Sequence, residues 1–160
     1  MIKVAKHERA GGYTDELKSL IETTMFKGAT AEAKPGMWVG VNECASKLNE
    51  LKSPYYGLWT FSQDGVLVAY YFLAPPLMKG NPVEACCDPA WVHFFGNIGG
   101  PEVGNFVFKH CCETVRAAGL TRFWGLVAPD RDPVKYVQRF AVEGYTPFVA
   151  GAIFECSVVI

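Results

Sequence analysis

The sequence lacks any strong imbalance of charge. It has 15 basic and 16 acidic residues, so its formal net charge is −1. Binding to the backbone of a nucleic acid requires a basic face. No block of like charge occurs along the chain. We therefore expect no nucleic-acid partner.

Long apolar runs are also missing. No run reaches the ~18 residues that a membrane-spanning helix requires. The first eight residues mix apolar and charged side chains, which favours a first strand over a signal peptide. We expect a cytoplasmic protein without a membrane partner.

The sequence has six cysteines but no Cys-x-x-Cys spacing, so neither a zinc ribbon nor a dithiol redox motif is expected. Four of them form the adjacent pairs Cys86-Cys87 and Cys111-Cys112, whose side chains point in different directions. We interpret the cysteines as small buried residues in a reducing compartment. No His, Cys, Asp and Glu residues have metal-ligand spacing, and the motifs Gly-x-Ser-x-Gly and Gly-Lys-Ser/Thr are absent.

What the chain does have is a large apolar fraction. Its 160 residues are 50% hydrophobic and 14% aromatic, which predicts a single domain over residues 1–160 with a sizeable core. The predicted elements are a strand at 1–6, helices at 13–26 and 38–51, strands at 55–61, 66–74 and 90–95, a helix ending at 119, a strand at 120–128, a helix starting at 133, and a last strand or strand pair at 148–159. Residues 77–88 are expected to form an irregular excursion or a bent strand. This order predicts an α/β (α+β) sandwich with a mixed, mostly antiparallel sheet of about six to seven strands and about four helices.

The most informative stretch runs from residue 89 to residue 147. A strand at 90–95 leads into a glycine-rich turn at 96–104, which is followed by an amphipathic helix. A glycine-rich turn at a helix start can hold a phosphate on backbone N–H groups. The apolar stripe expected to face the sheet consists of Val103, Val107, Cys111, Thr114 and Ala118, with Phe106 and Val115 at its edge.

In element order and motif position the chain resembles the GNAT superfamily of acyl-CoA N-acyltransferases. In that family a strand leads into a loop patterned Arg/Gln-x-x-Gly-x-Gly/Ala and then into a helix. Counting back from Gly119 puts Gly104 at the last glycine of that loop. The hairpin around Asp64-Gly65 resembles the family's central hairpin, and residues 140–145 resemble its Tyr-x-x-x-Gly-Phe ending. The resemblance covers nearly the whole chain.

The resemblance implies that the strand at 90–95 diverges from its neighbour and that acetyl-CoA, the expected acyl donor, inserts there. The expected cofactor-binding residues are Phe95, Asn97, Gly100, Val103, Gly104 and Asn105. His93 is the candidate general base, because an imidazole titrates near neutral pH; a hydrogen-bonded histidine within the sheet is the alternative. Tyr136 is the candidate to protonate the leaving thiolate, Tyr145 is a second candidate, and a core position is the alternative for both. The acceptor would be a small-molecule or peptide amine.

Three positions depart from the family's pattern. Gly99 stands at the Arg/Gln position, Glu102 at the middle glycine, and Phe140 where the family often has a tyrosine. Glu102 also suits the first turn of a helix, where negative charge complements the helix dipole. We favour an acyl-CoA-dependent N-acyltransferase that acts by direct attack of the amine.

Two other classes of function stay open. One is a non-catalytic GNAT-like structural or interaction protein, for example a phage virion component. The other is a module that binds acyl-CoA and only senses it. The aromatic content and low net charge suit an assembly surface, so a homodimer or a larger assembly is also open.

Overall fold

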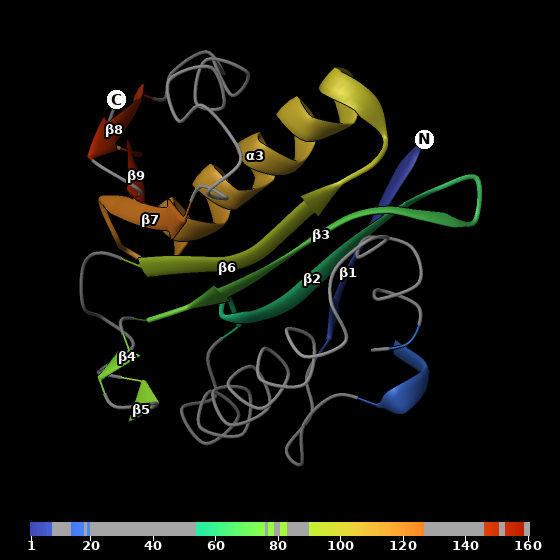
Figure 1. Cartoon of the computed structure of the whole chain (residues 1–160), viewed down its shortest axis with the longest axis horizontal. Coiled ribbons are helices and arrows are strands. Elements are labelled where there is room, and N and C mark those ends of the chain that lie inside the picture. The colour runs from blue at the N-terminus through green and yellow to red at the C-terminus, as the bar shows by residue number, and fades with distance from the viewer. Residues whose placement is uncertain are drawn as a thin grey trace.

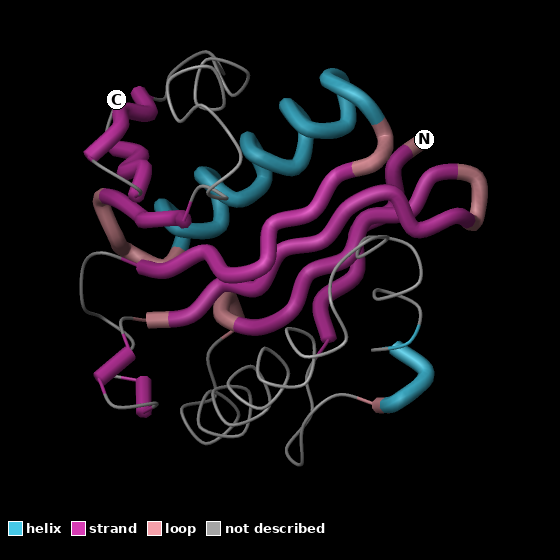
Figure 2. The backbone as a smooth tube through the Cα atoms, viewed as in Figure 1, coloured by secondary structure: helices cyan, strands magenta, loops and turns pink. Residues whose placement is uncertain are grey.

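A computed structural model of the chain describes residues 1–7, 14–17, 19, 54–75, 77–78, 81–82, 90–126, 146–150 and 153–158. These residues build a seven-stranded sheet with the helix α3 (Gly100–Ala117) lying along one face, as Figures 1 and 2 show. Within this part of the chain, no helix is long and apolar enough to cross a membrane.

The sheet has the strand order β1-β2-β3-β6-β7-β9-β8. Its strands are β1 (Ile2–His7), β2 (Gly57–Gln63), β3 (Val66–Ala74), β6 (Ala90–Asn97), β7 (Arg122–Leu126), β8 (Thr146–Ala150) and β9 (Ile153–Ser157). β6 and β7 are parallel, with α3 as the crossover between them, and the other neighbouring pairs are antiparallel. The predicted mixed, mostly antiparallel sheet is therefore confirmed. A separate small hairpin joins β4 (Leu77–Met78) to β5 (Asn81–Pro82), within the stretch for which an irregular excursion or a bent strand was predicted.

Several predicted elements match the structure closely. β3 has the predicted bounds, whereas β2 begins and ends two residues later than predicted. The turn between them is formed by Asp64 and Gly65, with φ of 52° and 80°, as an Asp-Gly hairpin turn requires. The last strand is divided in two, β8 and β9, which was one of the two alternatives. Of the predicted helices, that at 13–26 is described only in part, and those at 38–51 and from 133 lie outside the described residues.

The glycine-rich turn is shorter than predicted. β6 continues through Asn97 because its end is paired with β3, and the N–H of Ile98 donates a further 2.8 Å hydrogen bond to β3. The helix α3 already begins at Gly100, so the turn is reduced to Ile98 and Gly99, and Gly104 lies inside the helix. The prediction of a loop through residue 104 was wrong, because β6 extends to Asn97 and α3 begins at Gly100.

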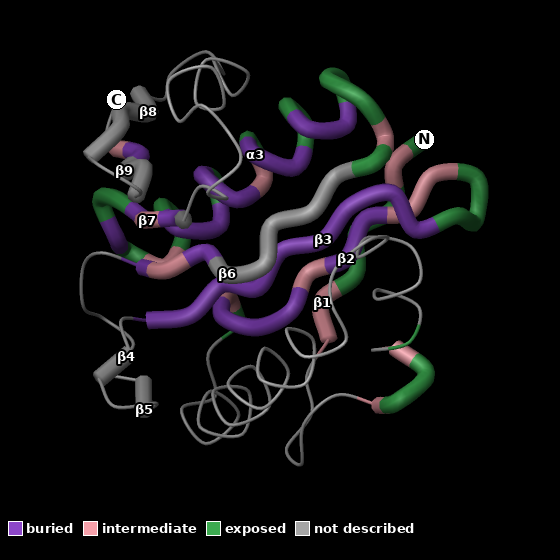
Figure 3. Tube along the Cα trace, viewed as in Figure 1, coloured by how far each residue is buried: buried purple, intermediate pink, exposed green. Residues whose placement is uncertain are grey.

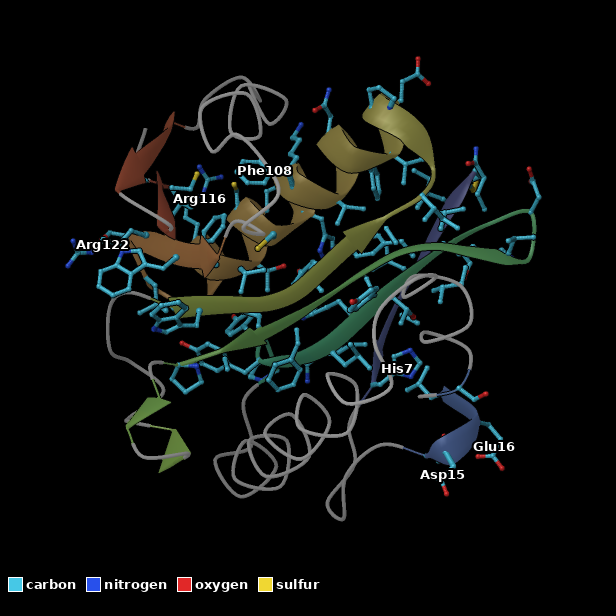
Figure 4. All side chains as sticks on the ribbon, viewed as in Figure 1. His7, Asp15, Glu16, Phe108, Arg116 and Arg122 are labelled. Carbon is cyan, nitrogen blue, oxygen red and sulfur yellow. The ribbon has the colours of Figure 1, made fainter. Side chains whose placement is uncertain are left out.

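The core of the described residues is centred on the middle of the sheet and includes the face on which α3 packs. Residues 67–74 of β3 are all buried, and Figure 3 shows burial concentrated there and on one side of the helix. The predicted stripe of α3 is buried at Val103, Val107, Cys111, Thr114 and Val115, whereas Ala118 is half-buried and Phe106 is exposed. Phe108 and Cys112 are also buried, and the Phe108 ring packs against Phe123 of β7 at 5.7 Å between centroids. At the far end of the crossover, Arg122 projects outward from the start of β7 (Figure 4).

The cysteines within the described residues are buried thiols, as predicted. Cys111, Cys112 and Cys156 are free and at most 1% exposed. The sulfur atoms of Cys112 and Cys156 lie 3.8 Å apart across the contact between α3 and β9. Cys44, Cys86 and Cys87 lie outside the described residues.

Candidate functional site

The end of β6 extends beyond its parallel neighbour. β6 is in register with β7 only at Ala90–Val92, yet it runs on to Asn97. Among the residues that the structure describes, none of β7 is in register with positions 93–97. Among the described residues, only β3 pairs with this half of β6, so its backbone can offer hydrogen-bonding groups on the side that faces away from β3.

The ladder between β3 and β6 is itself interrupted at one position. Tyr70 is in register with Gly96 and Phe72 with His93, so Tyr71 stands opposite two residues of β6. Such a β-bulge bends the strand that carries the extra residue and increases its twist. In the described part of the chain, this bulge lies beyond Val92, the last residue of β6 that is in register with β7.

The start of α3 has no side-chain cap. Its N-cap is Gly99, which has no side chain, so no side-chain cap occupies the end of the helix. Pro101 has no N–H, so the amides at this end come from Gly99, Gly100 and Glu102. Gly100 has φ of +85°, a conformation that glycine adopts without strain. The carboxylate of Glu102 lies in the same first turn, on an exposed residue.

Gly99 has a packing role that accounts for the missing Arg/Gln. A Cβ at this position would lie 2.7–2.9 Å from three side-chain atoms of Val103, which is closer than real Cβ contacts come. Val103 is buried and 5% exposed, so it has little room to move. The turn is therefore built around a glycine, and an arginine could enter only if the helix start shifted.

The predicted cofactor-binding residues come together at this one corner of the fold. They are Phe95 and Asn97 on β6 and Gly100, Val103, Gly104 and Asn105 in the first two turns of α3. Within these turns, the N–H groups of residues 103–105 point to carbonyls four residues earlier, so ligand contacts by amides fall to the helix start.

The candidate proton-transfer residues are less well described. His93 lies on β6, in register with Phe72, and its side chain lies outside the described residues. Tyr136 and Tyr145 lie wholly outside them.

A buried polar network joins β3 to α3 beside this corner. The hydroxyl of Tyr71 lies 2.9 Å from Nδ1 of His110 and 3.4 Å from Oγ1 of Thr114. The hydroxyl of Thr114 donates to the backbone carbonyl of His110 at 2.8 Å, so its oxygen can only accept from Tyr71. The arrangement that uses both contacts of Tyr71 therefore has His110 Nδ1–H donating to the tyrosine oxygen and the tyrosine O–H donating to Thr114.

The imidazole of His110 is packed among aromatic rings. Its centroid lies 4.9 Å from that of Trp59 and 5.2 Å from that of Phe61, both edge-on. Burial lowers the pKa of His110 below 6.5, and the carboxylate of Glu113 partly offsets this. Burial also raises the pKa of Tyr71 well above its usual value. Both residues are therefore neutral at pH 7, and the network carries no net charge.

Neither a protein-family model nor a curated protein matches the sequence. Solved structures do match the fold. The ribosomal-protein-S18-alanine N-acetyltransferase from Escherichia coli is 12% identical with a TM-score of 0.57, over 100% of this chain and 96% of that one. The chain has the GNAT fold.

Two further GNAT structures extend this comparison. The GNAT domain of S. lividans PAT is 17% identical with a TM-score of 0.54, over 98% of this chain and 89% of that one. The N-acetylglutamate synthase from Neisseria gonorrhoeae, complexed with coenzyme A and N-acetyl-glutamate, is 10% identical with a TM-score of 0.52, over 99% of this chain and 35% of that one. The similarity in fold spans essentially all of this GNAT-like chain.

The Tyr71–His110–Thr114 network was not predicted from the sequence. His110 and Thr114 are four residues apart on a helix, so the sequence does place them on one face. Tyr71 is one of two adjacent tyrosines on an apolar strand, and nothing in the pattern indicates which of them meets the helix. Only the tertiary contact between β3 and α3 identifies the pair.

Proposed function

We propose that this chain is an acyl-CoA-dependent N-acyltransferase that transfers an acetyl group from acetyl-CoA to a primary amine by direct attack. The observation that supports it is the end of β6. Among the described residues, the strand is in register with β7 only as far as Val92; it is bulged opposite Tyr71, and after Ile98 it leads into the glycine N-cap of α3. In the GNAT fold this is the corner at which the acyl donor is expected.

The residues at this corner suit the two parts of such a donor. Backbone groups of Phe95 and Asn97 would pair with the amide groups of the pantetheine arm, as an added strand does. The amides at the start of α3 and the helix dipole would hold the diphosphate. When bound, acetyl-CoA would supply a thioester whose carbonyl carbon accepts the amine.

Two features of the same turn should weaken the binding of the diphosphate. Pro101 removes one N–H donor, and Glu102 adds a negative charge near the phosphates. Because Glu102 is exposed, its side chain can turn to solvent and its charge is partly screened by salt. We therefore expect binding that is weaker than a complete loop would give.

The chain's own groups would handle the protons. His93 would take the proton from the ammonium form of the acceptor, and Tyr136 would give a proton to the leaving sulfur. Direct attack depends mainly on holding the amine and the thioester in position. The presence of Phe140 instead of a tyrosine does not exclude the reaction. The proposed acceptor is a small-molecule or peptide amine in the cytoplasm.

The first test is isothermal calorimetry with acetyl-CoA on the full chain, followed by thiol release in the presence of a panel of primary amines. Micromolar to millimolar binding with amine-dependent thiol release is expected. No binding at millimolar acetyl-CoA rejects the proposal and favours the structural role. Binding without turnover on any amine favours the sensor.

Two glycine variants locate the site. Gly100 and Gly119 lie at opposite ends of α3, have φ of +85° and +81°, and leave open space around an added Cβ. Gly100→Ala and Gly119→Ala therefore impose the same kind of backbone strain, about 1–2 kcal/mol each. Only Gly100→Ala should weaken acetyl-CoA binding. Equal losses in both variants would contradict the placement of the site at the helix start.

A further inference from the structure

The ladder between β3 and β6 has one gap, and it coincides with the polar network. Tyr71 is the β3 residue that faces the bulge of β6, where regular backbone pairing is disrupted. Its side chain leaves the strand on the face that carries α3 and reaches His110 and Thr114. Where the bulge disrupts the backbone pairing of β6 with β3, the side-chain hydrogen bonds of Tyr71 connect β3 to α3.

Backbone contacts at this corner also involve β3. The end of β6 is paired with Ala69 and Tyr70, and the Ile98 N–H bonds the carbonyl of Val68. Thus β3 holds the end of β6 by its backbone and the middle of α3 by Tyr71. The distance between the free edge of β6 and the first turn of α3 depends on both attachments.

We propose that Tyr71, His110 and Thr114 form a positioning network that sets the end of β6 against the start of α3 and thereby tunes the affinity for the acyl donor. This inference rests on the proposed function. The three residues are positioning residues, because none of them lies at the helix start or on the free half of β6.

The network is well suited to this task because it is closed and rigid. Thr114 is locked by its bond to the carbonyl of His110, one helical turn earlier. The imidazole is held between the edges of Trp59 and Phe61. Tyr71 is fully buried, at 0% exposure. Its hydroxyl therefore has a fixed partner on α3 and cannot exchange it for water.

The first experiment compares two adjacent tyrosines. Tyr71→Phe removes only the hydroxyl that contacts α3. Tyr70→Phe is the matched control: Tyr70 is also buried, at 2% exposed, and by strand alternation it points to the opposite face of β3. Calorimetry with coenzyme A should show Kd raised about three- to tenfold in Tyr71→Phe, as expected for one lost hydrogen bond. Tyr70→Phe should leave Kd unchanged.

The second experiment separates positioning from stability. His110→Asn keeps a hydrogen-bonding group near the place of Nδ1, whereas His110→Leu removes it but is the better helix former and the more apolar residue. If His110 has only a structural role, His110→Leu should reduce coenzyme A affinity less than His110→Asn does. The positioning role predicts the reverse for coenzyme A affinity, with His110→Asn close to the wild type and His110→Leu close to Tyr71→Phe.

The third measurement does not require a ligand. Amide hydrogen exchange of residues 93–104 should be faster in Tyr71→Phe than in the wild type and unchanged in Tyr70→Phe, with circular dichroism confirming that both variants are folded. If the wild type binds coenzyme A but Tyr71→Phe binds equally well, the inference is overturned. If the wild type does not bind, the proposed function fails. The effect on affinity then fails with it, and the exchange result decides only whether the network positions β6 against α3; unchanged exchange in Tyr71→Phe overturns that as well.

Discussion

The turn between β6 and α3 offers a test of how tightly this corner is built. Gly99→Ala adds one methyl group at a backbone conformation, φ −87° and ψ 5°, that any residue can adopt. At such a position the substitution by itself would stabilise the protein by about 0.4–1 kcal/mol, because the unfolded chain loses freedom. The new methyl, however, would meet Cγ2, Cβ and Cγ1 of Val103 at 2.7, 2.8 and 2.9 Å, where ordinary contacts are 3.4–4 Å.

The destabilisation caused by the clash with Val103 should exceed the stabilisation that comes from the reduced entropy of the unfolded chain. Forcing an extra methyl into a packed site costs about 1–3 kcal/mol, and Val103 is buried and cannot move away. We expect Gly99→Ala to lower the free energy of unfolding by about 0.5–2 kcal/mol in urea titrations, the difference between the two effects.

The double variant with Val103→Ala provides the control for this reasoning. Val103→Ala removes two of the three contacting atoms, so the cost of the double variant should be smaller than the sum of the two single costs. A Gly99→Ala protein that is as stable as the wild type, or a strictly additive double variant, would refute the proposed packing.

Three further predictions concern charge, pH and the core. Glu102→Gln should tighten coenzyme A binding about two- to fivefold at low salt in calorimetry. Glu113→Gln, nearer the other end of α3, should leave the affinity unchanged, and equal effects of the two variants would exclude a local effect of the Glu102 charge on the ligand. Because burial lowers the pKa of His110 below 6.5, the unfolded chain binds more protons than the folded one below that pH, so the free energy of unfolding should fall as the pH drops through about 6.5. His110→Gln should flatten that decline in urea titrations, and an unchanged slope would contradict it. Phe61→Ala, at a residue 0% exposed, should cost about 3–5 kcal/mol, whereas Val66→Ala, at a residue 59% exposed, should change stability by less than about 0.5 kcal/mol.

Much of the fold could be predicted because its signals are local. The Asp64-Gly65 turn requires two positive φ angles, which that dipeptide adopts readily, and it placed the β2–β3 hairpin. The apolar stripe of α3 follows from the helical repeat, and Gly119, with φ of +81°, ended the helix where predicted. Each of these features depends on residues within one turn or one strand of each other.

The boundaries at the candidate site were predicted less well. The glycines at 96 and 104 suggested a long loop, but Gly96 is paired in β6 and Gly104 is buried in α3. Glycine only permits unusual backbone conformations, and these two positions do not use that freedom. The glycines that matter at the helix start are Gly99, for its close contact with Val103, and Gly100, for its positive φ.

The sequence by itself determined the class of the fold, the hairpin, the sheet-facing side of α3 and the corner at which the predicted site residues gather. It did so because periodicity, turn chemistry and helix ends act over short stretches of chain. Only the tertiary structure decided where β6 parts from β7, that Tyr71 faces a bulge, and that His110 is its partner. These features depend on contacts between residues up to 39 positions apart, whose geometry is set by the packing of α3 on the sheet.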